Sequence, residues 1–547
     1  MMHGDAPDGA RTRLPRPRFL RLTIAGFLAA CLIASPASAA PSWLPPMNAS
    51  GVEKTAESPQ VAVDSQGNAT AIWRRWSGEK LIIESAVRPV GGVWSVPATL
   101  DVDTGGGYES SQSPQVAVDP EGDATAVWER RLDGRTFVIK SATRPAGGSW
   151  SAPITISSMG RFNDWPRVVV DSEGNATAVW LWSIGESSVV QSATRPAGGI
   201  WSAPVNVSAV GRAAFFFDVA LDPQGGATAV WEDESKGTIQ SATRPAGGSW
   251  SAPVDLSTAG AFAHSPQVAV DPQGNATAVW ERYNPKGTLI QSATRPAGGS
   301  WSAPVNLFKP KRHAQQPQIA VDPQGNATAV WARSNGDELI IQGATRPPGG
   351  SWSAPVDVSG DGGRGGEKPQ LVVDPRGTAT AVWRGYDRNR HTDAIQAATR
   401  PLRGRWSSPT DISNRTKTIG ISEPQVAVDP LGNATVVWAL GSKGGAIIQS
   451  ATSVNGRAYA ARVIRVKGAR ASIALRCERG EPCGGVIRLK VGRKLIAAKR
   501  FGIASGRTRI IRAKLSRRGF KLLTESRRPL RAKLVGRGIK NRTVLLK

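Results

Sequence analysis

The sequence predicts an all-β fold: an eight-bladed β-propeller of four-stranded blades closed by the N-terminal strand, followed along the chain by a small C-terminal β-sandwich. Two observations indicate repeated units. The phrase SATRPAGGSWSAPV stands at 241–254 and again at 292–305. Ala-Val-Trp, or a close variant of it, recurs about every fifty residues, a period typical of propeller blades. The tripeptide ends at Trp73, Trp128, Trp180, Trp231, Trp280, Trp331, Trp383 and Trp438.

Residues 266–308 show how one unit is built. Alternating, Val-rich segments at 266–271, 276–282, 288–294 and 301–307 predict four short strands. The connection DPQGN at 271–275 has Asp, Pro and Gly where a type I turn prefers them. Because Pro304 cannot donate to a ladder, the segment WSAP is expected on the outer edge of the blade, with QVAVD innermost.

The two ends of the repeat region complement each other, which is the third observation behind the fold. The eighth repeat stops after AIIQSAT at 446–452, and Ser42-Trp43-Leu44-Pro45 has the shape of the missing edge strand. We therefore expect a propeller over 41–452, a linker over 453–462 and a basic β-sandwich domain over 463–547. The eight edge tryptophans are Trp43, Trp94, Trp150, Trp201, Trp250, Trp301, Trp352 and Trp406.

The hairpin VAVDPQGNATAVW at 268–280 resembles the start of NHL-type propeller repeats. The resemblance covers about a dozen residues of each unit; it implies the fold and nothing about a ligand. The Asp box of sialidases is a weaker match, since Gly274 and Trp280 follow Asp271 by three and nine residues. The C-terminal segment resembles the basic immunoglobulin-like domains that end many secreted actinobacterial proteins.

The first forty residues predict a signal peptide. Five arginines precede the apolar stretch Leu22–Ile33, and Ala37-Ser38-Ala39 offers a cleavage site. The protein is therefore expected to be secreted or held at the cell surface, with no transmembrane segment. In an alternative interpretation, Leu28–Cys31 is a lipobox and Cys31 carries a lipid anchor. Of the remaining cysteines, Cys477 and Cys483 predict a disulfide rather than a metal site.

The charge of +27 is concentrated at the C-terminal end. Residues 453–547 hold 28 Lys and Arg against 3 Asp and Glu, whereas 41–452 hold 36 against 37. Such a field raises the local concentration of polyanions, so this domain is predicted to adhere to an anionic surface polymer, without nucleic-acid specificity. The outward-facing basic pairs are Arg488 with Lys490, Arg512 with Lys514, and Arg531 with Lys533.

The connections predict two different faces of the propeller. In an antiparallel meander the first-to-second and third-to-fourth connections share one face, and both are repetitive here. The other connections lie on the opposite face and vary, so a binding site is expected there. The candidates on this variable face are Trp76, Asp164, Trp165, Trp182, Phe216, His264, Tyr283, His313 and Tyr386.

The sequence leaves enzymatic activity open and favours a non-enzymatic function. No nucleophile motif, metal spacing or cofactor motif occurs, and no catalytic residue, metal or cofactor is predicted. The favoured hypothesis is an exported, monomeric binding or scaffold protein whose variable face recognises a glycan or protein. The alternative is a propeller glycoside hydrolase, sialidase-like, or a lyase acting on extracellular glycans. Two carboxylates converging near the axis of the variable face would distinguish the alternative.

Overall fold

The computed structural model describes residues 41–547 apart from 52–54, 104–112, 134, 185–186, 261, 309–312, 361–363, 417–419, 443–444, 455–457, 461–462, 468, 478–482, 492–493, 504–506, 525–529, 536–541 and 547. The predicted signal peptide, with Cys31, lies outside the described residues, as do several positions of the predicted linker.

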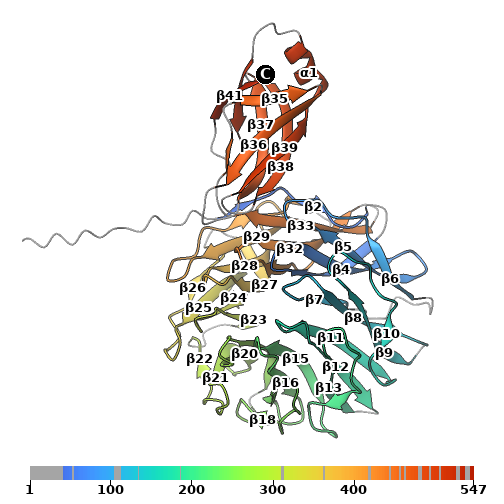
Figure 1. Ribbon diagram of the computed structural model, residues 1–547. Helices are drawn as coiled ribbons and strands as arrows, with labels where there is room; N and C mark the ends of the chain where they lie inside the picture. The colour runs from blue at the N-terminus through green and yellow to red at the C-terminus, as the bar shows by residue number, and fades with distance from the viewer. Residues whose placement is uncertain are drawn as a thin grey trace, which may run out of the picture. The chain divides into compact units, whose positions relative to one another are not determined.

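Eight antiparallel sheets follow one another along the chain, each with its strands in sequence order (Figure 1). The eight-bladed propeller is thereby confirmed. The first four blades are β3 (Thr55–Val63), β4 (Ala69–Trp76), β5 (Leu81–Arg88), β6 (Ala98–Asp103); β7 (Gln115–Val118), β8 (Ala124–Arg131), β9 (Phe137–Arg144), β10 (Ile154–Thr155); β11 (Phe162–Val170), β12 (Ala176–Ile184), β13 (Ser187–Arg195), β14 (Val205–Asn206); and β15 (Ala214–Leu221), β16 (Ala227–Asp233), β17 (Thr238–Arg244), β18 (Val254–Asp255).

Blades 5 to 7 repeat this pattern. Their strands are β19 (Ala263–Val270), β20 (Ala276–Arg282), β21 (Leu289–Arg295), β22 (Val305–Asn306); β23 (Ala314–Val321), β24 (Ala327–Ser334), β25 (Leu339–Arg346), β26 (Val356–Asp357); and β27 (Arg364–Val373), β28 (Ala379–Asp387), β29 (Thr392–Arg400), β30 (Thr410–Asp411).

Blade 8 joins the two ends of the repeat region, as the sequence predicts. It holds β31 (Gln425–Val428), β32 (Ala434–Ser442) and β33 (Gly445–Val454), and its outer edge is formed by β1 (Ser42–Trp43) and β2 (Met47–Asn48). Ser42 pairs with Val454, and Met47 pairs with Ser450. In Figure 1 the blue strands β4 and β5 consequently stand beside the orange strands β32 and β33.

The first strand of each blade contacts the first strand of the next, from β3 round to β31 and back to β3. These strands therefore line the axis, and the last strands lie outside. The outer strand is shorter than predicted: in blade 5 only Val305–Asn306 pairs, not 301–307. Ser302 N donates to Thr294 O (2.8 Å), and the chain then leaves the ladder at Pro304, which has no N–H.

The core of the propeller lies between neighbouring blades. The repeated tryptophans of the second strands are at most 1% exposed. Trp231 of blade 4, for example, packs against Val179, Leu181 and Val190 of blade 3. Each blade thus buries its face against the next, which explains why the same tryptophan is needed eight times.

The C-terminal domain is a β-sandwich with its own core, including Phe501, Leu475 and Leu534. Strand β35 belongs to both sheets, and the predicted disulfide between Cys477 and Cys483 is present. A short helix, α1 (Arg517–Thr524), was not predicted. The strands are β34 (Ala458–Ala460), β35 (Val463–Lys467), β36 (Arg470–Cys477), β37 (Cys483–Val491), β38 (Lys494–Ile503), β39 (Thr508–Lys514), β40 (Leu530–Val535) and β41 (Arg542–Leu546). No helix among the described residues has the length and apolar character needed to cross a membrane.

Candidate functional site

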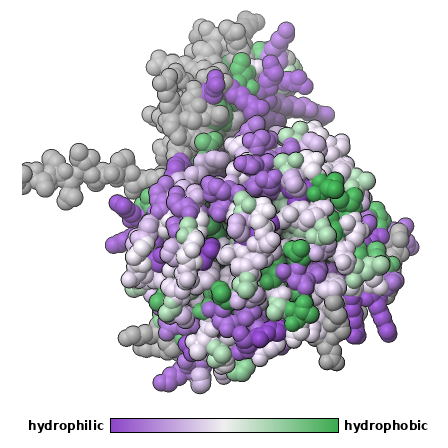
Figure 2. Space-filling view, turned by 60° about the horizontal axis from the view of Figure 1, so that its bottom comes forward, coloured by the Kyte–Doolittle hydropathy of each residue, from purple (hydrophilic) through white to green (hydrophobic). Residues whose placement is uncertain are grey.

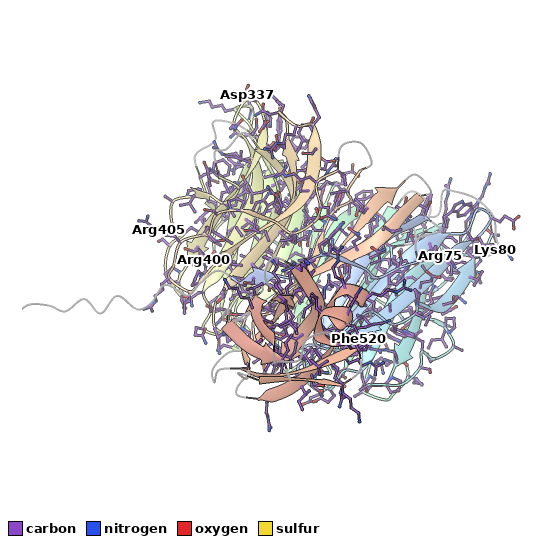
Figure 3. The ribbon with its side chains drawn as sticks, turned by 90° about the horizontal axis from the view of Figure 1, so that it is seen from above. Arg75, Lys80, Asp337, Arg400, Arg405 and Phe520 are labelled. Carbon is purple, nitrogen blue, oxygen red and sulfur yellow. A yellow bond between two sulfur atoms is a disulfide. The ribbon has the colours of Figure 1, made fainter. Side chains whose placement is uncertain are left out.

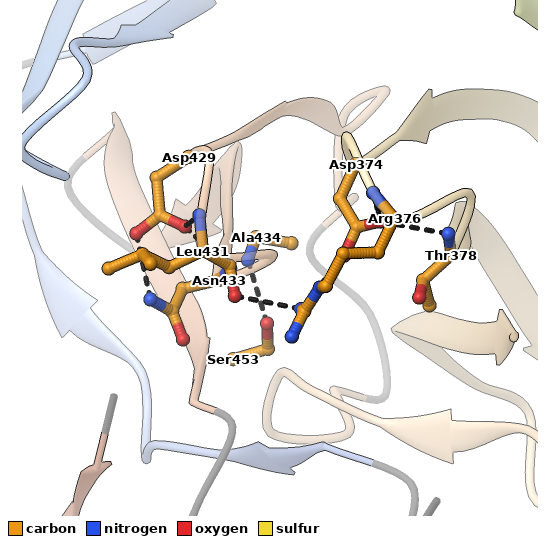
Figure 4. Close-up of polar contacts among 8 residues, drawn as sticks. All are labelled: Asp374, Arg376, Thr378, Asp429, Leu431, Asn433, Ala434 and Ser453. Carbon is orange, nitrogen blue, oxygen red and sulfur yellow. Dashed lines mark hydrogen bonds and ion pairs between the residues drawn. The ribbon is translucent and has the colours of Figure 1, made fainter. Parts of the chain in front are cut away.

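The repetitive face is built from turns that bind one another. In blade 5, Asp271 Oδ1 accepts from Gln273 N (3.0 Å) and Asn275 N (2.8 Å), and Asn275 Oδ1 accepts from Ala297 N in the RPAGG turn (2.9 Å). Both repeated connections therefore share one face. Figure 4 shows the same arrangement around Asp429, where Arg376 of the preceding blade also donates to Leu431 O (2.8 Å). The carboxylates of these turn aspartates therefore accept the hydrogen bonds that hold the turns in shape.

The repeated arginines link neighbouring blades. Arg244 Nη2 donates to Thr177 Oγ1 (2.9 Å), and its guanidinium lies 5.6 Å from the centre of the Trp250 ring. Seven arginines do the same, and burial lowers their pKa, to about 10 for Arg88. Since each is already bound, none is free to hold a substrate carboxylate. The pairs are Arg88–Thr435, Arg144–Thr70, Arg195–Thr125, Arg244–Thr177, Arg295–Thr228, Arg346–Thr277 and Arg400–Thr328.

The opposite face carries two rows of side chains near the axis. We define the rim row as the described residues among the two that precede the Pro-Gln of each first strand, or its equivalent: 57–58, 113, 164–165, 215–216, 264–265, 315–316, 367–368 and 422–423. In six blades the pairing register between the first and second strands shifts at these two residues. In the same six blades the second of the two residues has a positive φ. Such backbone strain is concentrated at functional sites.

The second row follows the repeated tryptophan. We define the post-Trp row as Arg74, Glu129, Leu181, Glu232, Glu281, Ala332, Arg384 and Ala439. Its members contact the rim row: Glu281 Oε1 accepts from Gln316 N of the next blade (2.8 Å), and Arg384 Nη1 donates to Glu367 (3.1 Å). The two rows together form what we call the axial rim.

Two carboxyl groups meet on the axial rim between blades 2 and 3. Glu129 is 1% exposed, and the half-buried Asp164 lies close enough to act on its pKa. Burial, and then the hydrogen bond and charge of Asp164, raise the pKa of Glu129 to about 11, although Arg74 acts in the other direction. Because two ionised carboxylates have no donor between them, this contact requires that one of them hold a proton. Glu129 is therefore protonated at neutral pH.

A second titratable group lies between blades 4 and 5. His264 Nδ1 is 2.8 Å from Glu232 Oε1. Burial raises the pKa of Glu232, against the effect of His264, and burial also raises the pKa of Glu281. Among the residues that the structure describes, no three His, Cys, Asp or Glu are grouped so as to hold a metal ion.

Two exposed aromatic rings stand next to Asp164. Trp165 and Phe216, from neighbouring blades, stack with ring centres 5.4 Å apart, and they are 38% and 50% exposed. Both have positive φ, 51° and 36°, a costly conformation for aromatic residues. The bulged backbone thus presents a flat apolar surface beside a carboxyl pair.

A cavity of about 780 Å³ completes the axial rim at blades 7, 8, 1 and 2. Glu57, Glu367, Lys368, Arg384 and Glu423 contribute its charges. Lys368 Nζ lies 2.6 Å from Glu423 Oε1, and Arg384 contacts Glu367 (3.1 Å) and Asp393 (2.9 Å). The volume is in the range of small-molecule sites.

Four of the nine predicted residues, Asp164, Trp165, Phe216 and His264, belong to the axial rim. The other five lie elsewhere. Trp182 Nε1 donates to Met159 O (3.4 Å), Tyr386 Oη is 3.0 Å from His391 Nδ1, and His313 Nδ1 accepts from Thr288 N (3.3 Å). Tyr283 is exposed after β20, and Trp76 ends β4 half-buried.

Connections between second and third strands reach away from the axis. Lys80 and Asp337, from two of them, lie at the outer margin of the molecule in Figure 3. On the face in Figure 2, hydrophobic residues form small separate patches among hydrophilic ones. The described residues on that face therefore offer no broad apolar surface for docking.

The sequence analysis missed the post-Trp row. Five of its eight members are charged, although the strands around them are apolar: Arg74, Glu129, Glu232, Glu281 and Arg384. A charge directly after an otherwise repeated tryptophan was the available signal. Charged residues that face a neighbouring blade must be paired or neutralised by a proton. In this row Arg74 and Arg384 are paired with carboxylates, and Glu129 holds a proton.

In the C-terminal domain, Arg512, Lys514 and Lys533 are exposed, whereas Arg488 and Lys490 are half-buried. The side chain of Arg531 lies outside the described residues. Polyanion binding by these residues stays a prediction.

The sequence matches no protein-family model, and no curated protein matches it. Solved structures share the fold. An ulvan lyase of polysaccharide lyase family PL25 is 9% identical over 73% of this chain and 96% of its own, with a TM-score of 0.45. The GH93 α-L-arabinofuranosidase of Fusarium graminearum is 13% identical over 62% of this chain and 92% of its own, with a TM-score of 0.36. At these identities the likeness shows the fold alone.

The hypothesis of a non-enzymatic binding or scaffold protein is wrong. The solved structures that share the fold include a polysaccharide lyase and a glycoside hydrolase. Asp164 acts on the pKa of Glu129, so the axial rim holds two interacting carboxyl groups of the kind expected for the enzymatic alternative. No pattern in the sequence indicated this pair, since its two members lie 35 positions apart on different blades.

Proposed function

We propose that the protein is an exported enzyme that cleaves glycosidic bonds in an extracellular polysaccharide, with Asp164 as its acid–base residue. The observation that carries this proposal is the carboxyl pair of Glu129 and Asp164, placed next to exposed aromatic rings on the variable face. Perturbed carboxyl groups of this kind are concentrated at catalytic sites.

The pair supplies a proton at neutral pH. Glu129 is buried and holds the proton of the pair, and Asp164, the outer member, takes over this proton and delivers it to the substrate. In hydrolysis, Asp164 donates this proton to the glycosidic oxygen, the bond from that oxygen to the anomeric carbon breaks, and water supplies hydroxide to that carbon and returns a proton to the pair. Glu129 touches no substrate and is a positioning residue.

The surroundings suit a sugar polymer. Pyranose rings present C–H faces that stack on aromatic surfaces such as Trp165 and Phe216. Arg74, which lies 3.0 Å from Glu57 in the cavity lining and also acts on Glu129, connects the carboxyl pair to the cavity. A chain of several sugar units can therefore occupy the axial rim from the aromatic pair to the cavity.

Export is part of the proposal. The predicted signal peptide and the disulfide between Cys477 and Cys483 both suit an extracellular protein. The NHL-like hairpins and the likeness of the tail to immunoglobulin-like domains are consistent with this, and both stay predictions.

The proposal is tested with residues 41–547 incubated with a panel of plant, algal, bacterial and fungal polysaccharides. New reducing ends report cleavage, and ultraviolet absorbance of unsaturated sugars separates a lyase from a hydrolase. Asp164→Asn should lower the rate by about 100-fold or more, since it removes an acid–base group. Asp337→Asn, on an exposed outer loop, is the matched control. Full activity of Asp164→Asn, or no cleavage of any member, would overturn the proposal.

A further inference from the structure

We propose that the polysaccharide carries free, protonated amino groups, as an N-unsubstituted amino-sugar polymer does. This inference rests on the function proposed above and concerns the same axial rim. It follows from the charges of the rim, from how its cations are paired, and from a buried oxygen atom that lacks a donor.

The axial rim is acidic in a strongly basic protein. The rim row contributes the carboxyl groups of Glu57, Asp164, Glu367 and Glu423, and the post-Trp row adds those of Glu129, Glu232 and Glu281. Since Glu129 is protonated, the other six stand against three permanent cations, Arg74, Lys368 and Arg384. The whole chain has a net charge of +27, so this surface departs sharply from the rest.

Each of these three cations is already held by a carboxylate. Arg74 lies 3.0 Å from Glu57, Lys368 lies 2.6 Å from Glu423, and Arg384 contacts both Glu367 and Asp393. A uronate or sulfated sugar would have to displace a carboxylate to reach any of them. Polyanionic glycans are therefore disfavoured at the axial rim.

In the post-Trp row, by contrast, a hydrogen-bond donor to a carboxyl oxygen is missing. Glu232 Oε2 is buried and has no hydrogen-bond partner, and its residue is 4% exposed. A buried acceptor without a donor costs free energy. An ammonium group brings three donors and a positive charge, and it would bind such oxygens strongly. A neutral hydroxyl brings one donor and no charge.

The raised pKa values of Glu232 and Glu281, caused first by burial, agree with this picture. A bound ammonium would favour the ionised carboxylates and bring these pKa values down. The stacked rings of Trp165 and Phe216 would add cation–π attraction to the same ligand.

The test compares two ligands that differ only in the amine. Chitosan oligosaccharides and fully N-acetylated chitin oligosaccharides of equal length are titrated into Asp164→Asn protein at about pH 6, where amines are protonated. Calorimetry measures binding without turnover. We expect the chitosan oligosaccharides to bind at least about tenfold more tightly, the gain of one charge-assisted hydrogen bond, and added salt to reduce the difference.

Two variants localise the effect. Glu232→Gln and Glu281→Gln keep hydrogen-bonding oxygens but remove charge, and they should each reduce the preference for chitosan oligosaccharides. Glu173→Gln, in an exposed turn of the repetitive face, is the control and should leave it unchanged. Equal affinity for the two ligands, or a preference unaffected by the rim variants, would overturn the inference.

The outcomes also separate this inference from the proposed function. Cleavage of a neutral or anionic polysaccharide by the wild-type chain, with no amine preference, would retain the enzyme and reject the amino-sugar substrate. A clear amine preference with no cleavage of any polysaccharide would retain the ligand class and reject the enzyme.

Discussion

The two faces of this propeller use the same strands for different purposes. On the repetitive face, seven arginines, seven threonines and eight turn aspartates make the same contacts from blade to blade. On the variable face, the equivalent positions vary among the blades, and three of them carry glutamates with raised pKa values. The adjacent residues Trp280 and Glu281 show the boundary: the first is repeated and buried between blades, and the second belongs to the axial rim.

This difference indicates that the repetitive face contributes mainly to stability and the axial rim mainly to chemistry. Damage to the repetitive face or to ring closure should lower the free energy of unfolding and leave the chemistry of the rim unchanged. Damage to the axial rim should do the opposite. The following predictions test that separation.

Deleting residues 41–50 should have the largest effect. The deletion removes both edge strands of blade 8 together with the buried side chains of Trp43 and Leu44. Loss of a buried tryptophan alone costs about 3–5 kcal/mol, and β33 would become an open edge. We expect a large drop in the melting temperature by calorimetry, or insoluble protein. A truncated chain that melts like its parent would show that the N-terminal strands do not close the ring.

Arg400→Ala should lower the free energy of unfolding by about 3 kcal/mol, because a buried hydrogen bond and a cation–π contact are lost together. Arg400 donates to Thr328 Oγ1 of the preceding blade (2.8 Å) and stacks on Trp406. Arg405, in the same turn and labelled with Arg400 in Figure 3, is exposed. Arg405→Ala should therefore change stability by less than about 0.5 kcal/mol.

Chemical denaturation of both arginine variants measures the contrast. Polysaccharide cleavage, measured well below the melting temperature, should be unchanged in each. Equal stability of the two variants would mean that the repeated arginines do not hold the blades together.

The separation of the faces also explains what the sequence could predict. Blade number, ring closure and the sides of the two faces follow from repetition, because the same contact must be made at each blade. The axial rim does not repeat, so its pairs cannot be read from a period. Asp164, Trp165, Phe216 and His264 were found as unusual residues in variable segments, whereas Glu129 was missed because it stands inside a repeated strand. Its partner Asp164 is on the next blade, which only the folded ring brings close.

Gly225→Ala should cost about 2 kcal/mol, less than the arginine change. Gly225 has a φ of 85°, and an added Cβ would lie 2.6 Å from Asp171 Oδ2 of the preceding blade. Gly147 has a φ of 70° with no heavy atom within 4 Å of the added Cβ, so Gly147→Ala carries the backbone strain alone, about 1 kcal/mol. The difference between the two unfolding free energies measures the contact between blades. If the two variants are equally stable, the turn aspartates do not constrain the neighbouring turn.

Glu129→Gln should change how the free energy of unfolding depends on pH. Burial raises the pKa of Glu129 from 4.5 to about 11, so between these values the folded state holds a proton that the unfolded state has lost. Stability that is fully present below the unfolded pKa is therefore lost as pH rises through this window. Glutamine has no proton to lose, so the free energy of unfolding should fall less steeply with pH in the variant.

Urea midpoints from about pH 5 to pH 9 measure this slope, with Glu173→Gln as the unchanged control. Other groups with shifted pKa values, such as Asp429 on the repetitive face, titrate in both proteins, so the difference between the two slopes reports on Glu129. An identical slope in Glu129→Gln and wild type would mean that Glu129 is ionised when folded, and Asp164 would then have no proton to share.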